Sequence, residues 1–181
     1  MIEITYIQMV IFITAAWILV RLAVAVKNKT FSIKREFLLL LVYICFIVLA
    51  RFVYFPLNHI DGKIGTLQIG LASNLTDFIE LKPFNFLSDA YIGRNINVIG
   101  NFTMFIPVGI IWPVCFKKLD NIFKALLACF GLSLFIELSQ LICLDRHTDI
   151  DDLILNSLGA LIGILIVFII RKIKKSRKKE A

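Results

Sequence analysis

Polar side chains recur inside the most apolar stretches of this sequence, where each is costly unless it meets a partner, water or a ligand. Three stretches carry such residues at three- or four-residue spacing, which places each set on one face of a helix. The sets are Asn97, Asn101 and the apolar Phe105; Ser133, Glu137 and Gln140; and Asp152 and Asn156. Together they could supply polar contacts to a ligand, and Glu137 could act as a general base.

Charged residues stand next to these stretches. Arg94-Asn95 precedes the first of them, and the segment 145–152 precedes the third. Three carboxylates of that segment, Asp149, Asp151 and Asp152, could bind a divalent cation through their oxygens. Their spacing differs from that of an EF-hand loop, so we predict neither a metal nor a cofactor.

Composition shows what kind of protein must position these residues. Of 181 residues, 59% are hydrophobic and 18% are charged, whereas a soluble domain is about 45–50% apolar and about a quarter charged. A soluble globule of this size has too little interior to hide that much apolar surface. A soluble enzyme, a nucleic-acid-binding domain and a disordered chain are therefore excluded, and a polytopic membrane protein remains.

Five apolar stretches are long enough to cross a bilayer as helices. They are 4–26, 37–55, 98–116, 122–144 and 153–170. The sequence therefore predicts an all-α bundle of five transmembrane helices, forming a single transmembrane domain over residues 1–181. The first stretch is predicted to be retained rather than cleaved as a signal peptide, because no basic residue precedes it.

The distribution of Lys and Arg predicts the orientation of these spans. Basic residues follow the first, third and fifth spans, and the fifth is followed by a basic tail at 171–181. The other two connections, 56–97 and 145–152, hold eight carboxylates. We therefore expect a multi-pass protein of the cell membrane with its amino terminus outside and its carboxyl terminus in the cytoplasm. On this interpretation the basic residues behind the net charge of +7 fix the orientation of the spans, and the basic tail could also contact anionic lipid. The charge does not indicate binding to nucleic acid.

The long outer connection shows a helical pattern of its own. Apolar residues recur there at three- and four-residue spacing: Leu67, Leu71, Leu75, Phe78 and Ile79. This spacing predicts an interfacial helix on the outer leaflet, ended by Pro83, where Pro83-Phe84 turns the chain back. It could act as a simple lid or contribute to ligand binding.

Structural roles compete with functional ones for several polar residues. Asn101, Gln140 and Asn156 could form hydrogen bonds between helices, and Glu137 could pair with Arg51 or Arg146. Gly159 and Gly163 have the spacing of a close helix–helix contact. Arg21, near the cytoplasmic end of its span, is expected to snorkel to the interface. A span ending at 144 would place Glu137 roughly 10 Å below the outer surface.

Four short motifs occur in order along the second half of the chain. They are Arg94-Asn95; Asn101-x-x-x-Phe105-x-Pro107-x-Gly109; Glu137-x-x-Gln140; and Arg146-x-x-Asp149-x-Asp151-Asp152-x-x-x-Asn156. Over about residues 83–170 the sequence resembles the VanZ-like family, which is named for a small membrane protein associated with teicoplanin resistance. In that family, resistance is attributed to a reduced effect of teicoplanin-type glycopeptides without remodelling of the D-Ala-D-Ala target. No catalytic mechanism is established for it.

Two functions follow as hypotheses, together with one weaker one. The first is a non-enzymatic protein whose outward polar pocket binds a lipid-anchored ligand, either an acylated glycopeptide such as teicoplanin or a cell-wall lipid intermediate. The second is an intramembrane enzyme with Glu137 as general base and Arg94 or Arg146 holding phosphate. A transporter is less favoured because five spans without a repeat suit alternating access poorly. The candidate binding residues are Arg94, Asn95, Asn101, Phe105, Glu137, Gln140, Arg146, Asp149, Asp151, Asp152 and Asn156. Membrane lipid or a lipid-linked envelope molecule is the expected partner, and the oligomeric state stays open.

Overall fold

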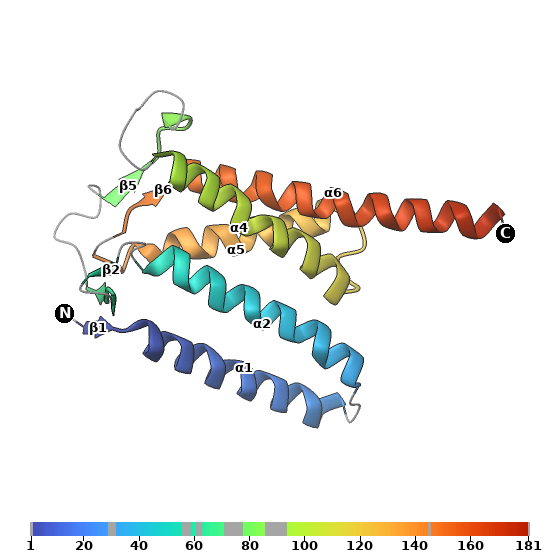
Figure 1. Cartoon of the computed structure of the whole chain (residues 1–181), viewed down its shortest axis with the longest axis horizontal. Helices are drawn as coiled ribbons and strands as arrows, with labels where there is room; N and C mark the ends of the chain where they lie inside the picture. The colour runs from blue at the N-terminus through green and yellow to red at the C-terminus, as the bar shows by residue number, and fades with distance from the viewer. Residues whose placement is uncertain are drawn as a thin grey trace. The chain divides into compact units, whose positions relative to one another are not determined.

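The computed structural model describes residues 2–28, 32–55, 59–60, 63–70, 78–85, 94–144 and 146–180 (Figure 1). These residues form two compact units. Unit 1 comprises Met1–Phe78 and Ser139–His147, and unit 2 comprises Ile79–Leu138 and Thr148–Ala181.

Five helices among the described residues are long and apolar enough to cross a membrane. They are α1 (Tyr6–Asn28), α2 (Ile33–Tyr54), α4 (Arg94–Cys115), α5 (Ile122–Gln140) and α6 (Ile150–Glu180). The predicted all-α polytopic class is confirmed. The boundaries differ from prediction by a few residues in α1, α2 and α4. The larger differences are that α5 ends at Gln140 instead of 144, and that α6 is longer at both ends than the predicted span 153–170.

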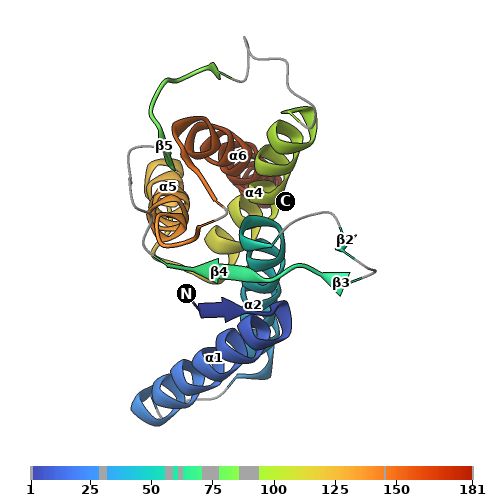
Figure 2. The same cartoon turned by 90° about the vertical axis from the view of Figure 1, so that its left-hand side faces the viewer.

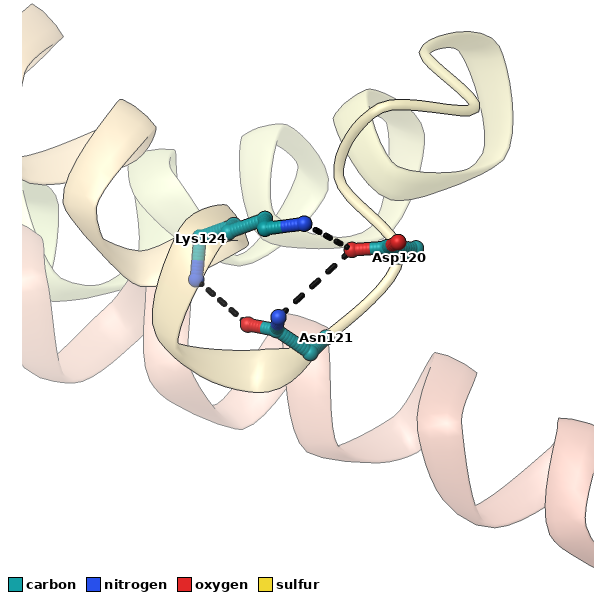
Figure 3. A network of polar contacts seen from close by, with 3 residues as sticks. All are labelled: Asp120, Asn121 and Lys124. Atoms are coloured by element: carbon teal, nitrogen blue, oxygen red, sulfur yellow. Dashed lines mark hydrogen bonds and ion pairs between the residues drawn. The ribbon is translucent and has the colours of Figure 1, made fainter.

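Side-chain caps explain where α5 and α6 begin. The Asn121 side-chain oxygen accepts a hydrogen bond from the Lys124 backbone N–H at 2.8 Å, and Asp120 pairs with the Lys124 ammonium at 2.8 Å (Figure 3). At the start of α6, an Asp149 carboxylate oxygen accepts from the Asp151 backbone N–H at 2.8 Å. Such caps satisfy amides that the first helical turn leaves without partners. The cap at Asp149 is the reason that α6 begins before its apolar run.

In unit 1, α1 and α2 form a hairpin joined by polar contacts. The hydroxyl groups of Thr14 and Tyr43 are 2.8 Å apart, and the Trp17 ring lies 5.8 Å from the Tyr43 ring. The Arg21 guanidinium pairs with the Glu36 carboxylate, with Nε at 2.9 Å. Arg21 therefore has an ion-pair partner on the next helix and does not simply snorkel, as the sequence suggested.

Short strands complete unit 1 (Figure 2). β1 (Ile2–Ile4) pairs antiparallel with β4 (Leu67–Ile69), and β2 (His59–Ile60) pairs antiparallel with β3 (Lys63–Ile64). Leu67 is buried in a core with Phe55 and Cys143.

The interfacial helix is not confirmed. Its predicted first turn, at Leu67–Ile69, is a strand, and Ile79–Glu80 forms another, β5. Residues 71–77 lie outside the described part of the chain. The prediction of a helix at 67–69 was wrong because β1 offers backbone partners there, and because Gly65 and Gly70 flank the segment and weaken a helix.

In unit 2, α4 and α6 run in the same direction, while α5 runs opposite to α6. Asn97 contacts Asp152 near the start of α4 and α6, and Arg171 contacts Pro113 near the end of α4. Between α5 and α6, Ser133 contacts Asn156 and the later Glu137 contacts the earlier Asp149.

Glycines let the backbones of α4 and α6 touch. A Cβ atom placed on Gly159 would lie 1.9 Å from the Phe102 carbonyl oxygen, and one on Gly163 would lie 2.2 Å from that of Ile106. Real Cβ atoms essentially never approach so closely. The packing role predicted for these two glycines is confirmed, and this contact sets the spacing of the polar residues above it.

Candidate functional site

Acidic and amide side chains gather at one end of unit 2, where α5 ends and α4 and α6 begin. We call this group the acid–amide cluster. Its members are Asn97 and Asn101 on α4; Glu137 on α5; and Asp149, Asp151 and Asp152 at the start of α6.

Glu137 fastens the start of α6 to the end of α5. One of its carboxylate oxygens, Oε2, accepts a hydrogen bond from the Asp149 backbone N–H at 3.1 Å, and its carbonyl oxygen accepts from the Thr148 hydroxyl at 2.8 Å. Thr148–Asp149 is strand β6. Glu137 is only 3% exposed. It lies three residues before the end of α5 at Gln140, about 4.5 Å along the axis, which is closer to the helix end than predicted.

A second set of hydrogen bonds holds residues 79–84, which precede α4, against the start of α6. β5 pairs with β6 in parallel, and the Phe84 backbone N–H donates to an Asp151 carboxylate oxygen at 2.6 Å. Phe84 has a φ of 66°, a backbone conformation that is unusual for a bulky residue. The predicted turn at Pro83-Phe84 is present. Asp151 is 2% exposed, whereas Phe84 is 54% exposed, so a buried carboxylate holds an exposed turn.

The amides of α4 face the third aspartate. The Asn97 side-chain amide donates to Asp152 at 3.3 Å, and the Asn101 amide donates to the Asn97 side-chain oxygen at 3.4 Å. Asn101 also forms a hydrogen bond with Asp152. Asn97 is exposed, so the cluster has an exposed edge on α4.

The cluster is rich in hydrogen-bond acceptors. The carboxylates of Asp149 and Asp152 act electrostatically on that of Glu137. The N-terminus of α6 favours the acids in its first turn, but Glu137 belongs to the C-terminal end of α5, where a helix disfavours negative charge. Such a site suits groups that donate hydrogen bonds or carry positive charge. Within the described residues, no set of three or more His, Cys, Asp or Glu is placed to hold a metal ion.

A buried polar pair lies one helical turn further along. The Asn156 side-chain amide donates to the Ser133 hydroxyl at 2.9 Å, and these residues are 3% and 0% exposed. The interhelical hydrogen bond proposed for Asn156 is thus present. Among the residues that the structure describes, the Asn156 side-chain oxygen has no hydrogen-bond partner, and such an unsatisfied acceptor is uncommon inside proteins.

Other predicted site residues lie elsewhere. Gln140 and Arg146 belong to unit 1, where the Gln140 amide donates to the Val53 carbonyl at 3.4 Å. Phe105 is fully buried and serves the core, whereas Asn95 is exposed at the start of α4. The side chain of Arg94 lies outside the described residues, as does Asp145 of the predicted roof.

An apolar groove between α5 and α6 was not predicted. It has a volume of about 430 Å³ and runs from Ile150 to Leu161. Its lining consists of Leu126, Phe130, Ile150, Leu153, Ile154, Ser157, Leu158 and Leu161. The Ser157 hydroxyl donates to the Leu153 carbonyl at 2.7 Å. The one polar side chain of the groove lining therefore already has a hydrogen-bond acceptor within its own helix. Sequence could not reveal it, because its lining resembles any lipid-facing helix surface.

Comparison with known proteins gives one match. A family model described as VanZ/LLP1 matches residues 37–171, more than half of the chain. The chain belongs to the VanZ/LLP1 family. The match begins in α2, well before the motif region at 83–170, and every member of the acid–amide cluster lies within it. No curated protein and no solved structure matches the chain.

Proposed function

We propose that this VanZ/LLP1 protein is a non-enzymatic membrane protein that binds a lipid-anchored ligand, either an acylated glycopeptide or a cell-wall lipid intermediate. The observation that carries the proposal is the position of the groove next to the acid–amide cluster. The groove begins at Ile150 and Leu153, which directly follow Asp149 and Asp152 of the cluster. The polar part of an amphiphile would meet the cluster, and its acyl chain would follow the groove.

The dimensions of the groove suit an acyl chain. Leu161 lies eleven residues after Ile150 on the same helix, or about 16 Å along it at the rise of an α-helix. Apolar lining with a few convergent polar groups at one end is the usual form of a small-molecule site.

The chemistry of the cluster favours one ligand class. Carboxylate and amide oxygens accept hydrogen bonds from hydroxyl and amine groups, while carboxylates repel phosphate. An acylated glycopeptide such as teicoplanin therefore fits better than a cell-wall lipid intermediate that carries phosphate. Sequestering such a drug would lower susceptibility to it.

The buried position of Glu137 supports binding over catalysis. A general base must come within hydrogen-bond reach of the proton that it removes. Glu137 is 3% exposed and already holds the Asp149 backbone N–H. Its role is to position the cluster.

We also propose that the acid–amide cluster faces outward, because Lys and Arg concentrate on the cytoplasmic side of membrane proteins. Cysteine would replace His147 or Lys118 in a chain whose four native cysteines are changed to alanine. An impermeant thiol reagent applied to intact cells should label only residue 147. Labelling of residue 118 alone would invert this orientation.

The binding proposal is tested by drug susceptibility in a Gram-positive host. Wild-type protein should protect against teicoplanin more than against vancomycin, which lacks the acyl chain, and Asp152→Asn should lose this selective protection. Asp120→Asn removes one carboxylate at the opposite end of unit 2 and should retain it. Equal protection by Asp152→Asn and wild type would contradict the role of the cluster.

A bulky substitution that fills the groove tests separately whether the acyl chain of the ligand binds there. Leu158→Trp should reduce binding of fluorescent teicoplanin to purified protein, while Leu165→Trp, also on α6 and outside the groove lining, should not. Purified protein should leave a cell-wall lipid intermediate chemically unchanged. Turnover of that intermediate would instead support the enzyme hypothesis.

A further inference from the structure

The last three turns of α6 carry a dense array of positive charge. Seven cations occupy the nine residues from 171 to 179, and all of them are exposed: Arg171, Lys172, Lys174, Lys175, Arg177, Lys178 and Lys179. The segment is helical through Glu180, without a break from the membrane-spanning part of α6. The basic tail predicted from the sequence is therefore the end of a transmembrane helix. We call residues 171–179 the basic extension.

Arg171 marks where the basic extension leaves the apolar core. Its guanidinium donates to the Pro113 carbonyl at 2.6 Å and lies 5.1 Å from the centre of the Phe168 ring. Pro113 is in the last turn of α4 next to Trp112, whose ring packs edge-on against Phe116. Tryptophan is enriched at the headgroup level of membranes. The apolar run 153–170 is about 27 Å long at the helical rise, close to the thickness of the hydrocarbon core.

The extension carries its charge mainly on one side. Lys172, Lys175 and Lys179 follow each other at three- and four-residue spacing, and Lys174 and Lys178 form the adjacent row. Ile173 projects from the other side, in line with Ile166 and Ile169, and is 49% exposed. A helix with five lysines on one side presents a continuous cationic face.

We propose that this cationic face binds the headgroups of anionic phospholipids in the leaflet where α6 ends. Its first two turns extend about 10 Å beyond Arg171, which is about one Debye length at physiological ionic strength. Basic residues this close to an anionic membrane surface are attracted to it. The membrane span holds the face at this surface permanently, whereas nucleic acid would have to be recruited from solution.

Limited trypsin cleavage of the full chain in nanodiscs tests the proposal. Cleavage after Arg177 is followed by mass spectrometry in phosphatidylcholine discs with and without phosphatidylglycerol, and cleavage of a soluble lysine-containing peptide in the same sample reports any general effect on the protease. We expect cleavage after Arg177 to slow about tenfold with phosphatidylglycerol, and high salt to reverse the effect.

Charge variants separate the cationic face from overall charge. The triple variant Lys172→Gln, Lys175→Gln and Lys179→Gln should lose the protection, while arginine at the same positions should keep it. The matched control Lys27→Gln, Lys34→Gln and Arg35→Gln removes equal charge from exposed positions of unit 1 and should leave the protection intact. Equal loss in both glutamine variants would overturn the assignment to α6. So would single-stranded RNA that protects Arg177 in phosphatidylcholine discs as well as phosphatidylglycerol does.

Discussion

The two ends of unit 2 use the same three helices in opposite ways. At the acid–amide cluster, Glu137 and Asp151 are buried and hold backbone amides from other segments. At the other end, the basic extension is exposed throughout. One end is assembled by specific contacts and suits a particular ligand. The other end acts through the total positive charge of its side chains, so it suits a charged membrane surface and needs no fixed side-chain geometry.

Helix direction explains the sign of charge at each end, with α5 as the exception. Acids stand at the start of α6 and bases at its end, as the helix dipole favours. Because α5 runs the other way, Glu137 near its end and Lys124 near its start oppose its dipole. Each has a compensating partner: the Asp149 backbone N–H holds Glu137, and Asp120 pairs with Lys124. Because one of these contacts lies at each end of unit 2, a substitution in either contact tests that end alone.

The largest effect is expected where both ends depend on one contact. Gly159→Ala would place a Cβ 1.9 Å from the Phe102 carbonyl oxygen, so α4 and α6 must separate. We expect a loss of several kcal/mol, of the order found for severe overpacking, and failure of both ends together. The measurements are yield of monodisperse protein in detergent and thermal unfolding.

Gly131→Ala is the matched control for that change. A Cβ on Gly131 meets no atom of the described part of the chain within 4 Å, and alanine stabilises a helix by up to about 1 kcal/mol relative to glycine. It should keep or raise the unfolding temperature. A Gly159→Ala protein as stable as Gly131→Ala would refute the close packing of α4 on α6.

A smaller effect, confined to the acid–amide cluster, is expected for Glu137. Glu137→Ala leaves the Asp149 backbone N–H without its acceptor, and an unsatisfied buried donor costs about 1–3 kcal/mol. Glu137→Gln keeps an acceptor oxygen and removes one of several neighbouring negative charges, so its stability should stay close to that of wild type. Denaturant unfolding measures both variants, and protease cleavage after Arg177 should stay unchanged in each. Equal destabilisation by alanine and glutamine would show that charge, rather than the hydrogen bond, matters.

The sequence predicted the spans and much of this cluster for simple physical reasons. Long apolar runs have few alternatives to a membrane helix, and four-residue spacing placed Ser133 and Glu137 on one helical face. The spacing of Gly159 and Gly163 indicated the backbone contact directly. These features are local, so the sequence contains them.

Features that depend on distant partners were not predictable. Leu141–Leu144 is as apolar as α5, yet the Leu144 backbone N–H donates to the Gln68 carbonyl at 3.0 Å and the helix has already ended. Hydropathy cannot distinguish such an apolar turn, bonded to another part of the chain, from another helical turn. The pairing of Arg21 with Glu36 likewise requires knowledge of how α1 and α2 meet.

The basic end offers a smaller test at Arg171. Its guanidinium caps the Pro113 carbonyl in the last turn of α4, where a cation stabilises a helix by about 0.3–1 kcal/mol. Arg171→Ala should lower the free energy of unfolding by that amount and leave ligand binding at the acid–amide cluster unchanged. Lys172→Ala removes an equal charge one residue further on and should cost less. A larger cost for Lys172→Ala would contradict the capping role.

The smallest effect is expected at Asp120, in the connection between α4 and α5 (Figure 3). The hydrogen bond that the Lys124 ammonium donates is the main cause that lowers the pKa of Asp120 below its ordinary value. Because the pKa of Asp120 is lower in the folded state, the pair contributes stability above the unfolded pKa of about 3.9 and loses it as pH falls through the folded value.

NMR titration of the Asp120 carboxyl carbon should show the pKa rising in Lys124→Gln and unchanged in Lys118→Gln. Since the pair is exposed, added salt should shrink the difference between wild type and Lys124→Gln. If the pKa of Asp120 changed neither in Lys124→Gln nor in added salt, Asp120 would not compensate the charge of Lys124. The positive charge at the start of α5 would then have no compensating partner in Asp120.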